Sequence, residues 1–178
     1  MRVHVEPMPL DALVELVNGW GVEPRRAGAR SAVPPLGDLA DRTGLPASVT
    51  AALTDPDLIQ FADTIFEVFT SAGTASRVAT ISGLLTTVDL RPDLALTDGR
   101  VRRTWWVDAR DALLAAALLA LRRQLCDEDP GRLGVCVDDG CADIYIDHSP
   151  AGRRRFCSIT CQNRARAASF RRRRRSAS

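Results

Sequence analysis

The chain has 178 residues, which is enough for one domain with a hydrophobic core and a small appendage. Its longest apolar run, around residues 113–121, is far shorter than the roughly 20 residues that span a bilayer. The first ten residues contain no apolar stretch typical of a secretory signal. We therefore expect a cytoplasmic protein without a membrane segment.

Charge is distributed unevenly along the chain. Residues 1–131 carry 13 Arg and 18 acidic residues (net −5), whereas residues 132–178 carry 11 Arg and 4 acidic residues (net +7). A basic C-terminal segment is typical of proteins that contact polyanions, and the acidic remainder indicates a different kind of partner.

The first half of the chain is predicted to be helical. Apolar residues at helical spacing predict a helix of about three turns from Leu10, with Trp20 closing its buried face. Residues 23–35 lack periodicity and predict a loop. Helices are then expected at about residues 37–42, 46–53, 56–71 and 74–88, with Asp55 as the N-cap of the third of these.

The character of the sequence changes after residue 90. Residues 91–107 alternate around Asp98-Gly99, which predicts a β-hairpin. Asp108 is expected to cap a helix over residues 109–125, and residues 127–131 are expected to form a hinge. The fold class predicted is α+β, with a mainly helical N-terminal domain (1–128) that contains one hairpin.

Four cysteines near the C-terminus predict a metal site. Cys136 and Cys141 form one close pair, and Cys157 and Cys161 form a second pair 16 residues later. Two close pairs that meet around one ion are typical of structural Zn²⁺ sites with four thiolate ligands. We expect a treble-clef-like finger over residues 132–175, in which a knuckle is followed by a hairpin (strands near 144–146 and 153–156).

A helix is expected to complete this finger, with Ser158 as its cap and the last two ligands in its first turn. Four cysteines also suit an iron–sulfur cluster, although zinc is the preferred interpretation. Cys126 is interpreted as a plain thiol, His148 as a turn residue, and His4 as a residue without a nearby partner.

The residues of this finger resemble a known family. The stretches Cys136-Val-Asp-Asp-Gly-Cys141, Tyr145-Ile-Asp-His-Ser149, Arg154-Arg-Phe-Cys-Ser158 and Cys161-Gln-Asn-Arg164 are similar to the C-terminal zinc finger of the CGNR family. Gln162 stands where the family name has glycine, and the second pair is separated by three residues rather than four. Both changes keep the two sulfurs on one helical face.

The resemblance extends weakly to the N-terminal part. Leu13-Val-Glu-Leu-Val-Asn18, followed by Trp20, is similar to the start of the ABATE domain that precedes the finger in this family. Members are described as transcription regulators, so the resemblance implies DNA binding. Separately from the resemblance, we expect the N-terminal domain to sense a small-molecule effector or to mediate self-association, and palindromic DNA sites would fit a homodimer.

The end of the chain predicts contact with nucleic acid. Ten Arg and no acidic residue occur from residue 153 onward, and such a density of positive charge attracts phosphate regardless of sequence. Base contacts would come from Gln162, Asn163 or Arg164, but Asn163 and Arg164 are equally compatible with bracing the finger. The candidate nucleic-acid residues are Arg153, Arg154, Arg155, Gln162, Asn163, Arg164, Arg166, Arg171, Arg172, Arg173, Arg174 and Arg175.

No catalytic constellation is expected, because the sequence lacks a plausible nucleophile–base set and a glycine-rich phosphate loop, and four thiolates leave no open metal position. Three hypotheses follow from the sequence. The chain is a DNA-binding regulator, or its finger is a protein-interaction or RNA-binding module, or its finger only stabilises a small-molecule binding domain.

Overall fold

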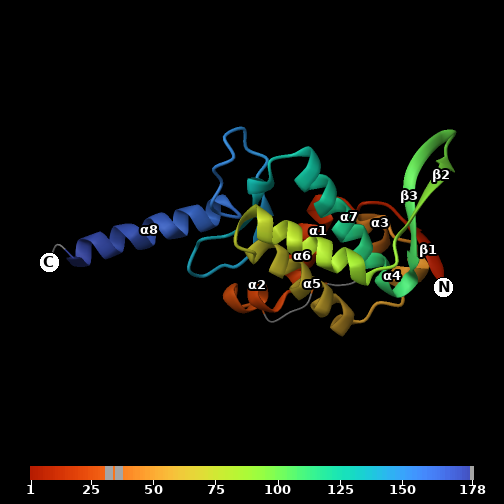
Figure 1. The fold of residues 1–178 in the computed structure, drawn as a ribbon. Coiled ribbons are helices and arrows are strands. Elements are labelled where there is room, and N and C mark those ends of the chain that lie inside the picture. The colour runs from red at the N-terminus through yellow and green to blue at the C-terminus, as the bar shows by residue number, and fades with distance from the viewer. Residues whose placement is uncertain (31–33, 35–37, 177–178) are drawn as a thin grey trace.

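The computed structural model describes residues 1–30, 34 and 38–176 and contains both helices and strands (Figure 1). None of the described helices combines the length and the apolar character needed to cross a bilayer. The helices are α1 (Leu10–Trp20), α2 (Val22–Ala27), α3 (Leu39–Thr43), α4 (Ala47–Thr50), α5 (Asp55–Thr70), α6 (Gly73–Thr87), α7 (Ala112–Asp127) and α8 (Ile159–Ser176), with 3-10 turns η1 (Ala109–Asp111) and η2 (Pro130–Arg132).

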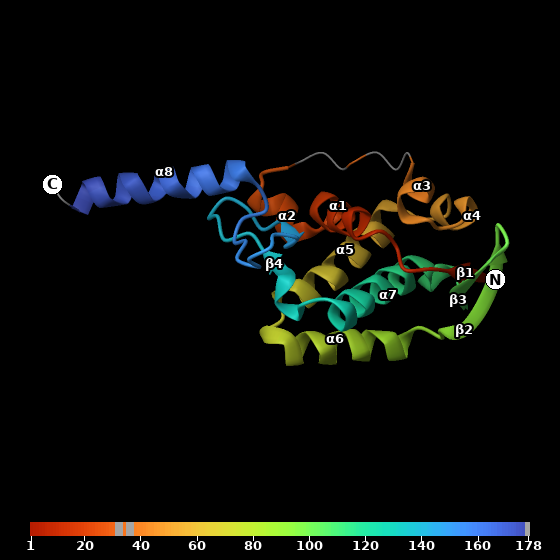
Figure 2. The same cartoon turned by 90° about the horizontal axis from the view of Figure 1, so that it is seen from above.

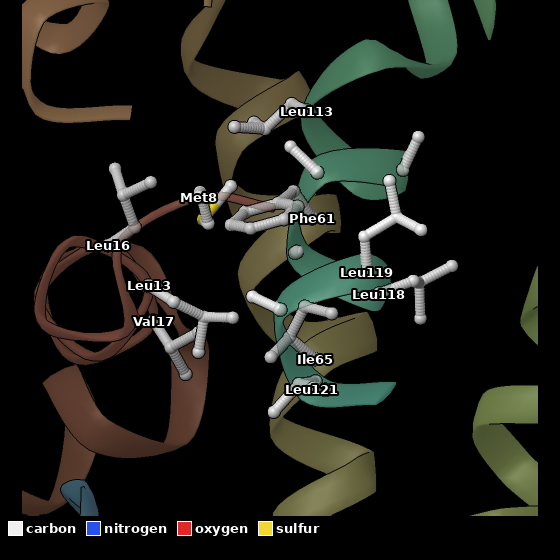
Figure 3. Close-up of a cluster of buried hydrophobic side chains, with 14 of the residues drawn as sticks. Met8, Leu13, Leu16, Val17, Phe61, Ile65, Leu113, Leu118, Leu119 and Leu121 are labelled. Atoms are coloured by element: carbon white, nitrogen blue, oxygen red, sulfur yellow. The ribbon is translucent and has the colours of Figure 1, made fainter. Parts of the chain in front are cut away.

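The hydrophobic core is built around α7, which lies between α1 and α5 on one side and α6 on the other (Figure 2). Leu118 and Leu121 of α7 are fully buried, as are Leu13 of α1 and Ile65 of α5, and their side chains meet in one cluster (Figure 3). Between its leucines α7 carries buried alanines, which allow helices to pack against more than one of its faces. The helices predicted from periodicity are thus confirmed, together with the fold class.

Two helix starts differ from the sequence prediction. Thr54, rather than Asp55, is the N-cap of α5, and its side chain forms a reciprocal capping box with Asp57. Asp108 is at the N-cap position of η1, where its side chain makes no capping hydrogen bond, and α7 begins only after this 3-10 turn. Asp108 instead lies 3.8 Å from the amino group of Met1.

The loop predicted for residues 23–35 is wrong in its first part, because α2 covers residues 22–27. Two tertiary contacts explain this helix. The Val22 amide donates a hydrogen bond to the Asp63 carboxylate of α5 (2.8 Å), and Pro24 is buried against the core. Neither contact is visible in the local sequence. Residues 31–33 and 35, and the predicted helix start at Gly37, lie outside the described residues.

A three-stranded antiparallel sheet closes one end of the core, with the order β1 (Arg2–Val5), β3 (Arg100–Asp108) and β2 (Arg91–Thr97). The hairpin at Asp98-Gly99 is confirmed, with both turn residues at positive φ (51° and 71°). Strand β1 was missed by the sequence analysis. The pairing brings His4 against Trp106 (ring centroids 3.7 Å apart) and Asp93 (2.9 Å), so the interpretation of His4 as a residue without a partner is wrong.

At the opposite end of the core, β4 (Leu133–Val135) and β5 (Ile144–Ile146) form a two-stranded antiparallel sheet, and α8 extends away from the body (Figures 1 and 2). Leu133, Ile144 and Ile146 belong to the same hydrophobic cluster as α1, α5 and α7. The cysteine region is therefore packed on the helical part. The division into domains 1–128 and 132–175 remains a prediction.

Candidate metal centre and basic helix

The structure brings the four predicted ligands together. The sulfurs of Cys136, Cys141, Cys157 and Cys161 all lie within 4.8 Å of one another. The Cys141–Cys157 sulfurs are 3.6 Å apart and the Cys157–Cys161 sulfurs 3.5 Å apart. A zinc ion with Zn–S bonds of about 2.3 Å in tetrahedral geometry places its sulfurs about 3.8 Å apart. The donor set and its spacing therefore fit Zn²⁺, with all four positions supplied by thiolates.

The first cysteine pair is held by the β4–β5 hairpin. Cys136 follows the last residue of β4, and its amide donates to the Asp143 carbonyl across the hairpin (2.9 Å). The Cys141 amide donates to the Asp138 carbonyl (2.9 Å), which turns the chain between the two ligands. The hairpin thus positions Cys136, and the turn positions Cys141.

The second pair lies at the start of α8. Ser158 accepts a hydrogen bond from the Cys161 amide (3.2 Å) and caps the helix, as predicted. Cys161 is in the first turn, but Cys157 precedes the helix, so the expectation that the first turn carries both ligands is half wrong. The rotation of α8 about its axis is therefore set by one ligand in the helix and one just before it.

The surroundings of the cysteines favour a bound cation. Burial raises the pKa of the Cys141 thiol to about 12, and it also raises the pKa of Cys157. A divalent ion among these sulfurs stabilises their thiolate form, so binding the ion and releasing the thiol protons are coupled. Zinc binding to these cysteines is therefore expected to depend on pH.

The segment that returns from β5 to α8 is organised by side chains. Asp147 accepts hydrogen bonds from the amides of Ser149 and Arg154 (both 2.8 Å), and Tyr145 donates its hydroxyl to the Arg154 carbonyl (2.6 Å). Residues 153–156 do not form the predicted second strand, and the partner of β5 is β4 instead. The hydrogen bonds from Ser149 and Arg154 lower the pKa of the Asp147 carboxyl to about 2.

Two arginines of the finger serve its structure. The Arg154 side chain donates to the carbonyls of Phe156 (2.8 Å) and Cys157, and its guanidinium lies 5.0 Å from the Tyr145 ring centroid. Arg132, which the sequence analysis passed over, donates to the carbonyls of Asp147 (2.8 Å) and Ser149 (2.7 Å). In the sequence, this structural role was indicated only by the position of Arg132, just before the first cysteine pair.

Arg164 braces the metal centre. Its Nε donates to the buried Asp138 carboxylate (2.6 Å), and its Nη2 lies 3.3 Å from both the Gly140 carbonyl and the Cys161 sulfur. A guanidinium in this position ties α8 to the knuckle and offsets the negative charge of the thiolates. Asn163, one residue earlier, is exposed and makes no side-chain hydrogen bond within the described part of the chain.

Helix α8 has a distinct outer face. Cys161 and Ala165 lie on the side that faces the finger, while Asn163, Arg166 and Phe170 follow one another at helical spacing on the opposite side. With 18 residues, α8 is about 27 Å long. The remaining candidate nucleic-acid residues are wholly or partly exposed, and they are Arg153, Arg155, Gln162, Arg171, Arg172, Arg173, Arg174 and Arg175.

Two of these arginines already have neighbours in the structure. Arg172 lies 3.5 Å from the Asp139 carboxylate of the knuckle, and the Arg174 guanidinium lies 5.9 Å from the Phe170 ring centroid. Both pairs are exposed to solvent, so they are weak and can exchange for a stronger anionic partner.

The other cysteine and the second histidine lie outside the metal cluster. Cys126 is exposed on α7. His148 follows β5 and is exposed, and its ring is not among the ligand atoms that gather around the four sulfurs.

Comparison with protein families agrees with this geometry. Residues 132–174 match the model of the CGNR zinc finger. This match spans β4, the knuckle, β5 and nearly all of α8, and includes the four cysteines. No curated protein matches the chain significantly.

Proposed function

We propose that this protein is a DNA-binding transcription regulator whose zinc finger contacts DNA through α8, while its N-terminal part senses a ligand or mediates association. The observation that carries the proposal is the position of α8. This helix starts at the metal centre and extends away from the body, with its basic half in solvent (Figures 1 and 2).

The outer face of α8 suits the major groove. A helix with its side chains is about 10–12 Å across, and the major groove of B-DNA is about 12 Å wide. In the first two turns this face presents Asn163 and Arg166, residue types that pair with adenine and guanine edges. Gln162 lies beside them. Arg171–Arg175 follow within the same helix, where they would contact phosphates.

Arg154 and Arg164 have a different role in this proposal. Their hydrogen bonds to the knuckle and to the start of α8 occupy the guanidinium groups that base reading would require. They orient the helix, and Asn163 and Arg166 read the sequence.

The N-terminal part would then control how the finger is presented. It resembles the ABATE domain at residues 13–18, and the last residue of that stretch, Asn18, is hydrogen-bonded to Ile144 of the finger. A change in α1 is therefore transmitted directly to β5. We also propose a cytoplasmic location, because a reducing compartment keeps the four cysteine thiols able to bind zinc. We propose that the metal centre is not catalytic, because four thiolate ligands leave no coordination position open for water or a substrate.

Selection of binding sites from random DNA, RNA and single-stranded pools at two salt concentrations tests the proposal. We expect enrichment of a defined duplex sequence that persists at the higher salt concentration. Asn163→Ala should relax the selected sequence, and Arg166→Ala should weaken binding. Arg122→Ala, which removes an exposed arginine of α7, is the matched control and should leave binding unchanged. Enrichment of no sequence in any pool would refute the proposal.

A second candidate is supported by exposed apolar residues on the same helix. Phe170 is 62% exposed and Ile159 76% exposed, which suits stacking on unpaired bases or contact with a protein. This alternative predicts that single-stranded RNA competes better than duplex DNA and that Phe170→Ala loses more affinity than Asn163→Ala.

A further inference from the structure

The segment that leads into α8 (Figure 1) lines a cationic hollow with a volume of about 340 Å³. The three consecutive arginines 153–155 lie at its surface. Phe156 and Ile159 add apolar side chains, and Ser158 and Gln162 add polar groups. No acidic residue lines the hollow in the described part of the chain. The hollow therefore combines positive charge with apolar surface.

The three arginines differ in what their side chains already contact. The Arg154 guanidinium is occupied by the backbone carbonyls of Phe156 and Cys157. Arg153 and Arg155 are exposed, and neither side chain has an ion pair or a hydrogen bond among the described residues. Each of their guanidinium groups offers five N–H donors in a planar fork that matches the geometry of phosphate oxygens. These two side chains are therefore available to an anion.

The backbone that carries these arginines is held in place by the finger. The Arg154 amide donates to the Asp147 carboxylate (2.8 Å), and its carbonyl accepts from the Tyr145 hydroxyl (2.6 Å). The Val137 amide donates to the Arg155 carbonyl (3.1 Å), which ties the segment to the knuckle. Because these bonds fix the backbone in advance, less conformational entropy is lost when the hollow takes a ligand.

The hollow adjoins the outer face of α8. Gln162 is one helical turn before Arg166, and residues four positions apart lie on the same side of a helix. When Arg166 faces the bases of a groove, Gln162 and the hollow lie one turn closer to the start of the helix, toward the edge of that groove. A nucleic-acid backbone presents a phosphate beside a sugar at this edge.

We propose that the hollow binds one phosphate group of the DNA backbone, with Arg153 and Arg155 contacting its oxygens and Gln162 donating through its side-chain amide. Phe156 and Ile159 pack against the neighbouring sugar. This inference rests on the proposed function, and it assigns Gln162 to a backbone contact instead of a base contact. Phosphate contacts fix position without reading sequence, so the hollow sets the register in which α8 lies in the groove.

The double variant Arg153→Ala with Arg155→Ala tests the site in the full zinc-loaded chain. Its affinity should fall about 10- to 100-fold, equally for the selected duplex and for a duplex of scrambled sequence, because hydrogen bonds to a charged phosphate are lost. The slope of log affinity against log salt concentration should become shallower by about 0.9, the value for one phosphate, although two arginines are removed. Zinc content and circular dichroism should stay unchanged, because both side chains are exposed.

Two further variants separate this site from general charge effects. Arg100→Ala with Arg103→Ala removes the same charge from the β2–β3 hairpin, at the opposite end of the molecule from α8 (Figure 2), and should leave affinity and slope unchanged. Arg153→Lys with Arg155→Lys keeps the charge but loses the planar fork. This lysine variant should keep the wild-type slope and still bind more weakly than wild type.

A duplex that carries a single neutral methylphosphonate locates the contact. When this group is moved along the backbone, the wild type should lose affinity most at one position, where the alanine double variant should be unaffected. Equal affinities of wild type and alanine double variant, a loss confined to the selected sequence, or displacement of the duplex by an equal concentration of inorganic phosphate would each overturn the role of the hollow. In those cases the wild type still selects a DNA sequence, whereas a wild type that selects none would refute the proposed function and the hollow with it.

Discussion

The side chain of Asn18 pairs with both backbone groups of Ile144: its Nδ2 donates to the Ile144 carbonyl (3.0 Å), and its Oδ1 accepts from the Ile144 amide (2.7 Å). The amide of Asn18 thus takes the place of a neighbouring strand on the free edge of β5. A salt bridge between Arg30 and Asp143 lies next to it. The finger is tied to the helical part by this pair of contacts as well as by the shared core.

Replacing Asn18 with alanine should loosen the finger without removing its metal. The Ile144 amide and carbonyl would lose their partner in a buried position, which costs about 1–3 kcal/mol of unfolding free energy. Hydrogen exchange in residues 133–146 should become faster, whereas metal content stays at one ion per chain. Asn163→Ala, which removes an exposed amide, is the control. Unchanged exchange in the Asn18 variant would contradict the role assigned to this contact.

Removing one sulfur ligand should unfold the finger. Structural zinc contributes on the order of 10 kcal/mol in small modules, so Cys161→Ser should lose the ion and the order of residues 136–161. Elemental analysis and NMR spectra of the labelled protein measure both effects. Cys126→Ser provides the control, because this thiol is exposed and outside the cluster. Stoichiometric zinc in the Cys161 variant would show that the other three thiols suffice.

Alanine substitutions of the neighbouring residues Asn163 and Arg164 should affect different functions of the protein. Arg164→Ala leaves the buried Asp138 carboxylate without its partner, and it should lower metal affinity by about 10- to 100-fold. Asn163→Ala should leave metal affinity unchanged and alter only sequence preference. Competition with a zinc chelator measures the first effect, and site selection measures the second. Equal metal affinities in the two variants would argue against the brace.

Asp147 should stabilise the finger with a characteristic pH dependence. Its pKa is lowered to about 2, from an unperturbed value of 3.8, so its stabilising contribution is fully present above about pH 4 and is lost as pH falls through 2. The difference in unfolding free energy between wild type and Asp147→Asn should therefore be constant from pH 4 to neutrality. Acid sensitivity of wild type within that range then comes from metal release. A difference that shrinks above pH 5 would be inconsistent with the lowered pKa.

The sequence was most informative where a pattern is local. Apolar spacing predicted α1, α5, α6 and α7, the Asp98-Gly99 pair predicted the hairpin, and the two cysteine pairs predicted the metal site. These features depend on residues a few positions apart.

The features that were missed depend on contacts between distant parts of the chain. Strand β1 exists because β3 pairs with it about 100 residues later, and α2 depends on Asp63 for its cap. The return strand predicted at residues 153–156 was wrong because β5 pairs with β4, which precedes the first cysteine pair. Arg132 and Arg154 likewise donate hydrogen bonds to backbone carbonyls of the loop that Asp147 organises. The conformation of this loop cannot be predicted from the spacing of residues in the sequence.

The shared core makes the cysteine region a poor candidate for transplantation. Leu133, Ile144 and Ile146 pack in the same cluster as the buried side chains of α1, α5 and α7. A fragment cut near residue 130 would keep its four thiolates yet expose this aliphatic surface to water, and it would be prone to aggregate even with zinc bound. Chimaeric proteins that graft the cysteine region onto another scaffold therefore need to include α1 as well.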